Sequence, residues 1–69
     1  MIQDTGYEIR VRGVLDEKWA AYFSPLVVSV VGNETLLSGT IHDQAELFGV
    51  LLKIRDLGLQ LVSVNPVQK

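Results

Sequence analysis

The stretch LVVSVVGNETLLSGTI, residues 26–41, decides the fold. Residues 26–31 are almost all apolar and rich in β-branched valine, which favours a strand buried on both faces. Gly-Asn-Glu at 32–34 is a hairpin signal, because glycine and asparagine tolerate the positive φ angles of tight turns. Residues 35–41 therefore predict the return strand. Gly39 within it indicates either a β-bulge or a close approach of another part of the backbone.

A long helix is expected directly after this hairpin. Asp43 and Glu46 have the spacing of a capping box, in which the first side chain caps the helix and the second lies three residues on. The helix is expected to run to about Leu57. It stops at Gly58, because glycine readily adopts the left-handed conformation that ends helices.

The remaining elements lie on either side of this central part. Residues 7–13 alternate apolar and polar side chains, which predicts a half-buried strand. Asp16 is the expected cap of a short helix over residues 17–23, which ends at Ser24-Pro25. Residues 59–64 predict the last strand, closed by Asn65-Pro66.

The predicted order is β-α-β-β-α-β. This order is that of a ferredoxin-like α+β fold, with a four-stranded antiparallel sheet and two helices, the first one short, on one face. We expect a single domain over residues 1–69, in which residues 1–6 form a loose N-terminal leader.

Composition excludes several functional classes. The chain has no cysteine and one histidine, so disulfides and the usual zinc ligand sets are absent, and we expect no metal and no cofactor. A net charge of −2 argues against nucleic-acid binding, which normally needs a basic excess. No apolar run approaches the ~20 residues of a membrane span, and no secretion signal is visible. We therefore expect a cytoplasmic protein with no membrane partner.

The long helix carries more apolar surface than one sheet can cover. On a helical wheel, one stripe faces the sheet and consists of Leu47, Val50, Leu51, Ile54 and Leu57. Phe48 and Leu52 fall outside it, beyond the polar Gln44 and Arg55. Two interpretations remain open: the short helix covers them through Trp19, or they contact another subunit.

The predicted sheet is apolar on both faces. The valines at 27, 28, 30 and 31, the leucines at 36 and 37 and the last strand place about six large side chains on the face without helices. Leaving them in water forgoes on the order of 10 kcal/mol, comparable to the whole stability of a small domain. A second copy packed sheet against sheet is the simplest cover, and a ligand pocket between the two sheets is compatible with it.

The signals for chemistry are weak. His42 precedes the helix cap and is a potential base, but a surface histidine in a turn explains it as well. Capping explains the acidic pairs, and Arg10 with Arg12 either holds an anion or faces cross-strand acids. Trp19 and Tyr22 concentrate the aromatic content in the short helix, where Tyr22 combines an apolar body with a polar tip.

The chain resembles a family of small uncharacterised bacterial proteins, commonest in actinobacteria and similar soil bacteria. The resemblance spans residues 7–64 and rests on these segments: YEIRVRG at 7–13, LD at 15–16, Trp19, Phe23, DQA at 43–45, Leu47, Gly49, IRDLGL at 54–59, Leu61, Ser63 and Val64. It implies no activity. It does include Gln44 and Arg55, which makes them the best polar candidates for a contact. The helix-glycine-strand ending also resembles ACT-type regulatory domains, although their ligand loop after the first strand is not matched here.

Three functions follow as hypotheses. The first is a homo-oligomeric interaction or regulatory module without catalytic activity, with Trp19, Tyr22, Gln44, Phe48, Leu52 and Arg55 as the candidate interface or ligand contacts. The second is a small dimeric α+β-barrel enzyme, of the cofactor-free monooxygenase or isomerase type, that uses Trp19, Tyr22 or His42 in a cavity between the sheets. The scarcity of inward polar residues favours the first. A third possibility is a protein partner bound by Phe48 and Leu52.

Overall fold

The computed structural model describes residues 5–15 and 18–67, and within them the elements follow the predicted order. The predicted cap Asp16 and residue Glu17 lie outside the described residues, as do residues 1–4 of the predicted leader. The elements are β1 (Thr5–Arg12), α1 (Lys18–Tyr22), β2 (Val27–Val31), β3 (Glu34–Ile41), α2 (Gln44–Asp56) and β4 (Gln60–Val67).

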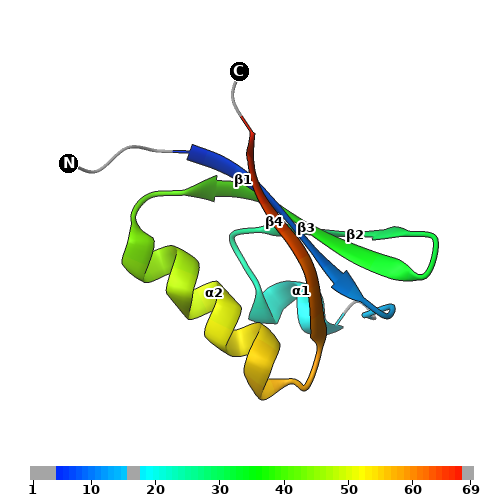
Figure 1. Ribbon diagram of the computed structural model, residues 1–69. Coiled ribbons are helices and arrows are strands. Elements are labelled where there is room, and N and C mark those ends of the chain that lie inside the picture. Colours follow the sequence, from blue (N-terminus) through cyan, green and yellow to red (C-terminus); the bar gives the residue numbers. More distant parts are fainter. Residues whose placement is uncertain (1–4, 16–17, 68–69) are drawn as a thin grey trace.

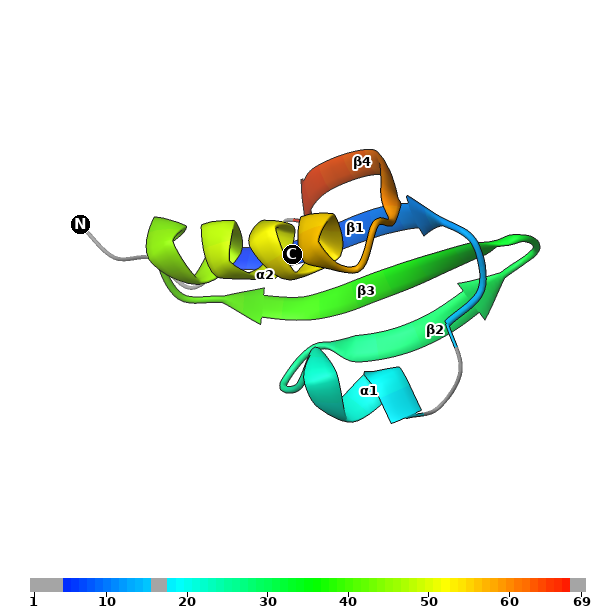
Figure 2. The same cartoon turned by 90° about the horizontal axis from the view of Figure 1, so that it is seen from below.

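The four strands form one antiparallel sheet with the order β2-β3-β1-β4. Both helices lie on the same side of it, with α2 alongside β1 and β3 and the short α1 near β2 (Figures 1 and 2). This is the predicted α+β, ferredoxin-like arrangement. It leaves β2 and β4 as the edges of the sheet, each paired with one neighbour only.

Local sequence signals place the turns and the helix end. Val31 pairs with Glu34, so the hairpin loop has two residues, of which Gly32 has a φ of 62°. At the end of α2, Gly58 has a φ of 73° and donates its N–H to Arg55 O at 2.9 Å. Leu59 donates to Ile54 O at 3.1 Å. These two bonds form a Schellman motif, so the predicted left-handed stop at Gly58 is confirmed.

The core lies between the sheet and the helices. Its buried apolar residues come from every layer: Ile9, Val11, Phe23, Leu26, Leu37, Ile41, Val50 and Ile54. Leu47, Leu51 and Leu57 pack against them, so the predicted stripe of α2 does face the sheet. Phe23, the residue directly after α1, is 1% exposed and closes the core beside β2.

Gly39 allows a close approach of Leu26 to the backbone of β3 and does not form a β-bulge. The register between β1 and β3 is continuous across it, with Tyr7 opposite Gly39. A Cβ at this position would lie 2.8 Å from Leu26 Cδ2 and 3.4 Å from Leu26 Cα. Gly39 also has a φ of 154°. The glycine therefore makes room for Leu26, which is 6% exposed and connects α1 to β2.

Several element boundaries differ from the sequence prediction, by one to three residues. β1 begins at Thr5 instead of Tyr7, because Thr5 and Gly6 find pairing partners in β3. α1 ends at Tyr22, one residue before the predicted end. β4 continues through Pro66 to Val67, although we expected Asn65-Pro66 to close it. Proline lacks an N–H, but an edge strand has one side without a ladder, so Pro66 is accommodated opposite Tyr7.

The sheet face without helices is not the continuous apolar layer that the sequence predicted. Ladder partners share a face, and Ile9 pairs with Leu37 on the helix side, so Arg10 and Leu36 lie together on the open side. The open face carries a central polar band formed by Glu8, Arg10, Arg12, Glu34, Ser38, Ser63 and Asn65. The expectation of about six large apolar side chains there is wrong, because most of the sheet's apolar residues alternate toward the helices.

Most of the large apolar residues of the open face lie near one edge. Val27, Val31 and Leu36 lie on β2 and on the neighbouring part of β3, and Val67 occupies the far end of β4. Arg10 Nη1 lies 3.5 Å from Glu34 Oε1, which gives this arginine a cross-strand acidic partner. A dry sheet-against-sheet contact would bury this polar band, so the surface available for self-contact shifts to the β2 edge.

Candidate functional site

The aromatic residues of α1 and Phe23 directly after it form a connected cluster at the junction with α2. The Trp19 and Tyr22 rings meet edge to face with centroids 5.7 Å apart, and Tyr22 meets Phe23 in the same way at 5.4 Å. Lys53 of α2 donates from Nζ to Tyr22 O at 3.0 Å, and its Nζ lies 5.1 Å from the centre of the Tyr22 ring. Lys53 thereby satisfies a carbonyl at the end of α1 and joins the two helices.

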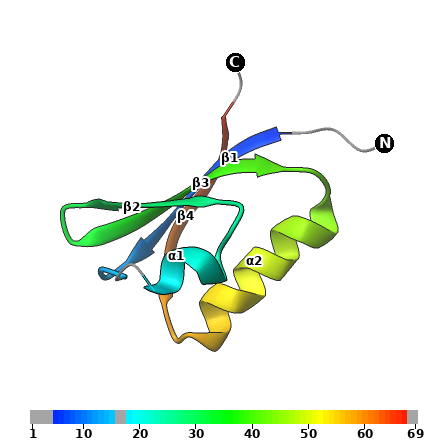
Figure 3. The same cartoon turned by 180° about the vertical axis from the view of Figure 1, so that it is seen from behind.

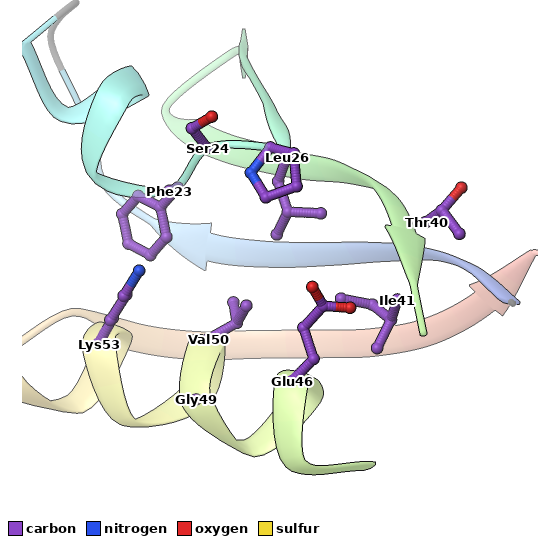
Figure 4. Close-up of a pocket in the computed structure, with 10 residues that line it drawn as sticks. Phe23, Ser24, Leu26, Thr40, Ile41, Glu46, Gly49, Val50 and Lys53 are labelled. Carbon is purple, nitrogen blue, oxygen red and sulfur yellow. The ribbon is translucent and has the colours of Figure 1, made fainter. Parts of the chain in front are cut away.

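A small open pocket lies beside this junction, between α2 and the segment that links α1 to β2. Figure 4 shows Glu46 and Lys53 rising from α2 on either side of Val50, toward Phe23 and Leu26. Its lining is completed by Ser24, Pro25, Thr40, Ile41 and Gly49. The floor is apolar, and one acidic and one basic side chain flank it.

The charged residues of this pocket already have partners in the fold. Glu46 Oε1 accepts a hydrogen bond from the His42 backbone N–H at 2.6 Å, and Lys53 is held by Tyr22. The cavity has a volume of about 130 Å³. Pockets that enclose small molecules usually measure about 300–1,000 Å³. The pocket is thus best explained as part of the contact between α2 and the α1 segment, and not as a ligand site.

His42 and the start of α2 form a compact polar cap. Asp43 accepts from the Glu46 N–H at 2.8 Å, which confirms Asp43 as the N-cap. Glu46 reaches back to the N–H of His42, one residue before the position used in a standard capping box. The His42 ring Nδ1 lies 3.0 Å from the same Glu46 oxygen. The hydrogen bond from the His42 backbone lowers the pKa of the Glu46 carboxyl, and the contact with the His42 ring lowers it further.

The contacts of the Glu46 carboxylate predict how the stability of the folded chain depends on pH. A depressed carboxyl pKa stabilises the folded state above the unfolded pKa, and the contribution is lost as the pH falls through the folded value. Compared with Glu46→Gln, the wild-type chain should therefore gain stability at neutral pH, and the gain should vanish in acid. Urea unfolding of both proteins between about pH 7 and pH 3 measures this difference. The same difference at both ends of the range would contradict the assignment.

The second candidate surface is the apolar ridge of α2, formed by Phe48 and Leu52. Their exposed fractions are 55% and 48%, so α1 does not cover them as one interpretation required. At about 100° per residue, they lie on a different side of α2 from Lys53, which faces α1. Gln44 and Arg55 are exposed on the ridge side, and Arg55 Nη2 contacts Asp56 Oδ1 at 3.2 Å. The six predicted contact residues therefore form two groups: Trp19 and Tyr22 on α1, and the others along α2.

The residues of the enzyme hypothesis do not meet on the open face. Trp19 and Tyr22 belong to α1, on the helix side of the sheet, and therefore cannot line a cavity between two open faces (Figure 1). His42 lies in the turn before α2. In residues 5–15 and 18–67, no group of three or more histidine, cysteine, aspartate or glutamate side chains is placed to hold a metal ion.

The third candidate surface is the β2 edge, although its run of valines predicted a strand buried on both faces. The strand is instead at the margin of the sheet, and its exposed fractions are 61% for Val27, 51% for Val30 and 45% for Val31. A run of apolar residues does not reveal this difference, because a central strand and an edge strand without protecting charges or prolines have the same composition.

Among the described helices, none is long and apolar enough to cross a bilayer.

These features define a class: a small ferredoxin-like α+β domain with an exposed apolar edge strand and an exposed helix ridge. The chain belongs to the family described as a domain of unknown function, DUF8691, whose model matches residues 6–65. The family is uncharacterised, as the resemblance in the sequence implied. No curated protein and no solved structure matches the chain.

Proposed function

We propose that the protein is a self-associating interaction module without catalytic activity. The observation that carries the proposal is the β2 edge, where a strand of four valines and one serine lies at the sheet margin with three of the valines about half exposed or more. Soluble proteins usually protect such edges with charge, proline or a bulge. β2 contains none of these.

The energetics favour a weak contact. Full burial of a valine is worth roughly 1.5–3 kcal/mol, so covering the exposed parts of Val27, Val30 and Val31 in two copies gains about 5–9 kcal/mol. Association costs an estimated 4–15 kcal/mol, and the backbone hydrogen bonds of a new strand pair add about 0.5–1.5 kcal/mol each. The gain and the cost are of similar size, so we expect a weak dimer that forms between micromolar and millimolar concentrations.

The ridge of α2 supports a further contact within the same proposal. Phe48 and Leu52 lie on α2, away from the β2 edge, so an edge-paired dimer would leave them exposed (Figure 2). We propose that these two residues, with Gln44 and Arg55 beside them, form the contact that builds a larger oligomer. Trp19 and Tyr22 are proposed as contacts at the α1 side of the edge.

Origin and compartment belong to the same proposal. The residue pattern from Tyr7 to Val64 supports a bacterial source of the actinobacterial type. The lack of cysteine supports a reducing, cytoplasmic compartment. We propose that the domain acts there without nucleic acid or membrane.

Sedimentation velocity over a dilution series tests the self-association. We expect the weight-average sedimentation coefficient to rise between about 5 µM and 1 mM, with a midpoint near the dissociation constant. Native mass spectrometry of the same samples gives the subunit number: two for the edge alone and more if the ridge takes part. A chain that remains monomeric at 1 mM would overturn the proposal.

A further inference from the structure

We infer that β2 pairs with β2 of a second copy, antiparallel and centred on Ser29, so that two four-stranded sheets join into one of eight strands. This inference rests on the proposed self-association and specifies its geometry. The sequence of the strand is Val-Val-Ser-Val-Val, which reads the same in both directions around Ser29. An antiparallel pair about a two-fold axis therefore matches every valine with a valine.

The register of this pair follows from the side-chain positions. Val27 and Val31 share the open face of the sheet, and the two-fold axis places Val27 of each copy opposite Val31 of the other. Antiparallel partners lie on the same face, so the exposed valines cover each other. A shift by one residue would place Val27 opposite a residue of the helix-facing set, so only registers that preserve this alternation are compatible.

The helix side provides a second match. α1 lies below the first part of β2, and the hairpin extends beyond it (Figure 3). Val28 accordingly packs against the core, whereas Val30 is 51% exposed. In the proposed pair, Val30 of each copy lies beside Val28 of the other, next to the part of the strand that the partner's α1 shelters. Each copy thus supplies the cover that the other copy lacks.

The lack of charged residues in β2 and the irregular pairing of β4 also favour a second copy at β2. No residue of β2 is charged, so the pair brings no like charges together along the strand. β4 is equally uncharged, but its register with β1 shifts between Arg10 and Val11, and Pro66 lacks a donor. Bulges and prolines disfavour the addition of a strand. Five residues per copy make a small interface, which agrees with a weak, concentration-dependent dimer.

Two opposite charges, introduced at positions that the proposed register places next to each other across the two-fold axis, test this register. Val27→Glu and Val31→Lys each place a charge against a valine of the partner and should each weaken the dimer at least about tenfold. Lysine is chosen at 31 because Glu34 is its neighbour in β3. The double variant places opposite charges across the axis and should restore the dimer to within about threefold of wild type. Within one chain the two positions are about 13 Å apart, too far for a direct ion pair.

The matched control is Val62→Lys on β4, which is also an exposed valine on an edge strand. It should leave the dissociation constant unchanged, and far-UV circular dichroism should show that all variants remain folded. If wild type associates but Val27→Glu has no effect, or if the double variant stays weakened, the inference fails while self-association stands. Weakening by Val62→Lys instead would assign the contact to β4. A monomeric wild type would overturn both proposals.

Discussion

Gly39→Ala should lower the free energy of unfolding by about 2–4 kcal/mol. The added Cβ would lie 2.8 Å from Leu26 Cδ2, a distance that real side chains do not tolerate. Overpacking of a closed core costs about 1–3 kcal/mol, and a positive φ at a non-glycine residue adds about 1–3 kcal/mol of strain. Leu26 is 6% exposed and packs within the core, so its side chain has little room to move away from the added Cβ.

Gly49→Ala is the matched control for this prediction. Gly49 lies within α2, and a Cβ there would meet no atom within 4 Å. The same chemical change should therefore raise the stability by about 0.5–1 kcal/mol, because alanine favours helix more than glycine does. Urea unfolding at one fixed low protein concentration measures both variants. Equal stability of Gly39→Ala and wild type would show that Leu26 does not pack against this backbone.

Thr35→Val should cost about 2 kcal/mol although the two side chains have the same shape. Thr35 is completely buried, and its hydroxyl donates to Gly13 O at 2.7 Å and accepts from the Leu15 N–H at 3.1 Å. This hydroxyl ties the loop after β1 to β3. Valine would leave both backbone groups without that partner, and a buried unsatisfied polar group costs about 1–3 kcal/mol.

Thr35→Ser separates the hydroxyl from the methyl group. It keeps both hydrogen bonds and should lose only the roughly 0.8 kcal/mol of one buried methyl, with a small cavity cost. Hydrogen exchange at the Leu15 amide is the specific readout: exchange should accelerate in Thr35→Val and not in Thr35→Ser. Unchanged protection of Leu15 in Thr35→Val would show that the hydroxyl is not its partner.

The elements that follow from local sequence were predictable. Gly32 and Gly58 adopt positive φ angles at the turn and the helix end, because no neighbouring part of the fold is needed to favour glycine there. Asp43 caps α2 for the same reason. The stripe of α2 follows from helical periodicity, which also predicted correctly that Phe48 and Leu52 fall outside the core.

The burial of the individual strands was not predictable in the same way. A run of valines is typical of a central strand, but β2 is an edge because the chain order places β3 and β1 in the centre. The alternation of β1 and β3 could be seen in the sequence, but which residues share a face depends on the register between strands. Thr35 and Gly39 acquire their roles only through residues distant in sequence, Gly13 and Leu26. The candidate site shifted from the open face to the β2 edge for this reason.

Hydrogen exchange of the β2 amides tests the central claim most directly. In an antiparallel edge strand, alternate N–H groups point outward and exchange readily when no partner covers them. If copies pair through β2, these amides should become more protected when the protein concentration rises from about 5 µM to 1 mM, while the outward amides of β4 stay unchanged. Exchange in β2 that is independent of concentration, in a sample that remains folded, would contradict the account.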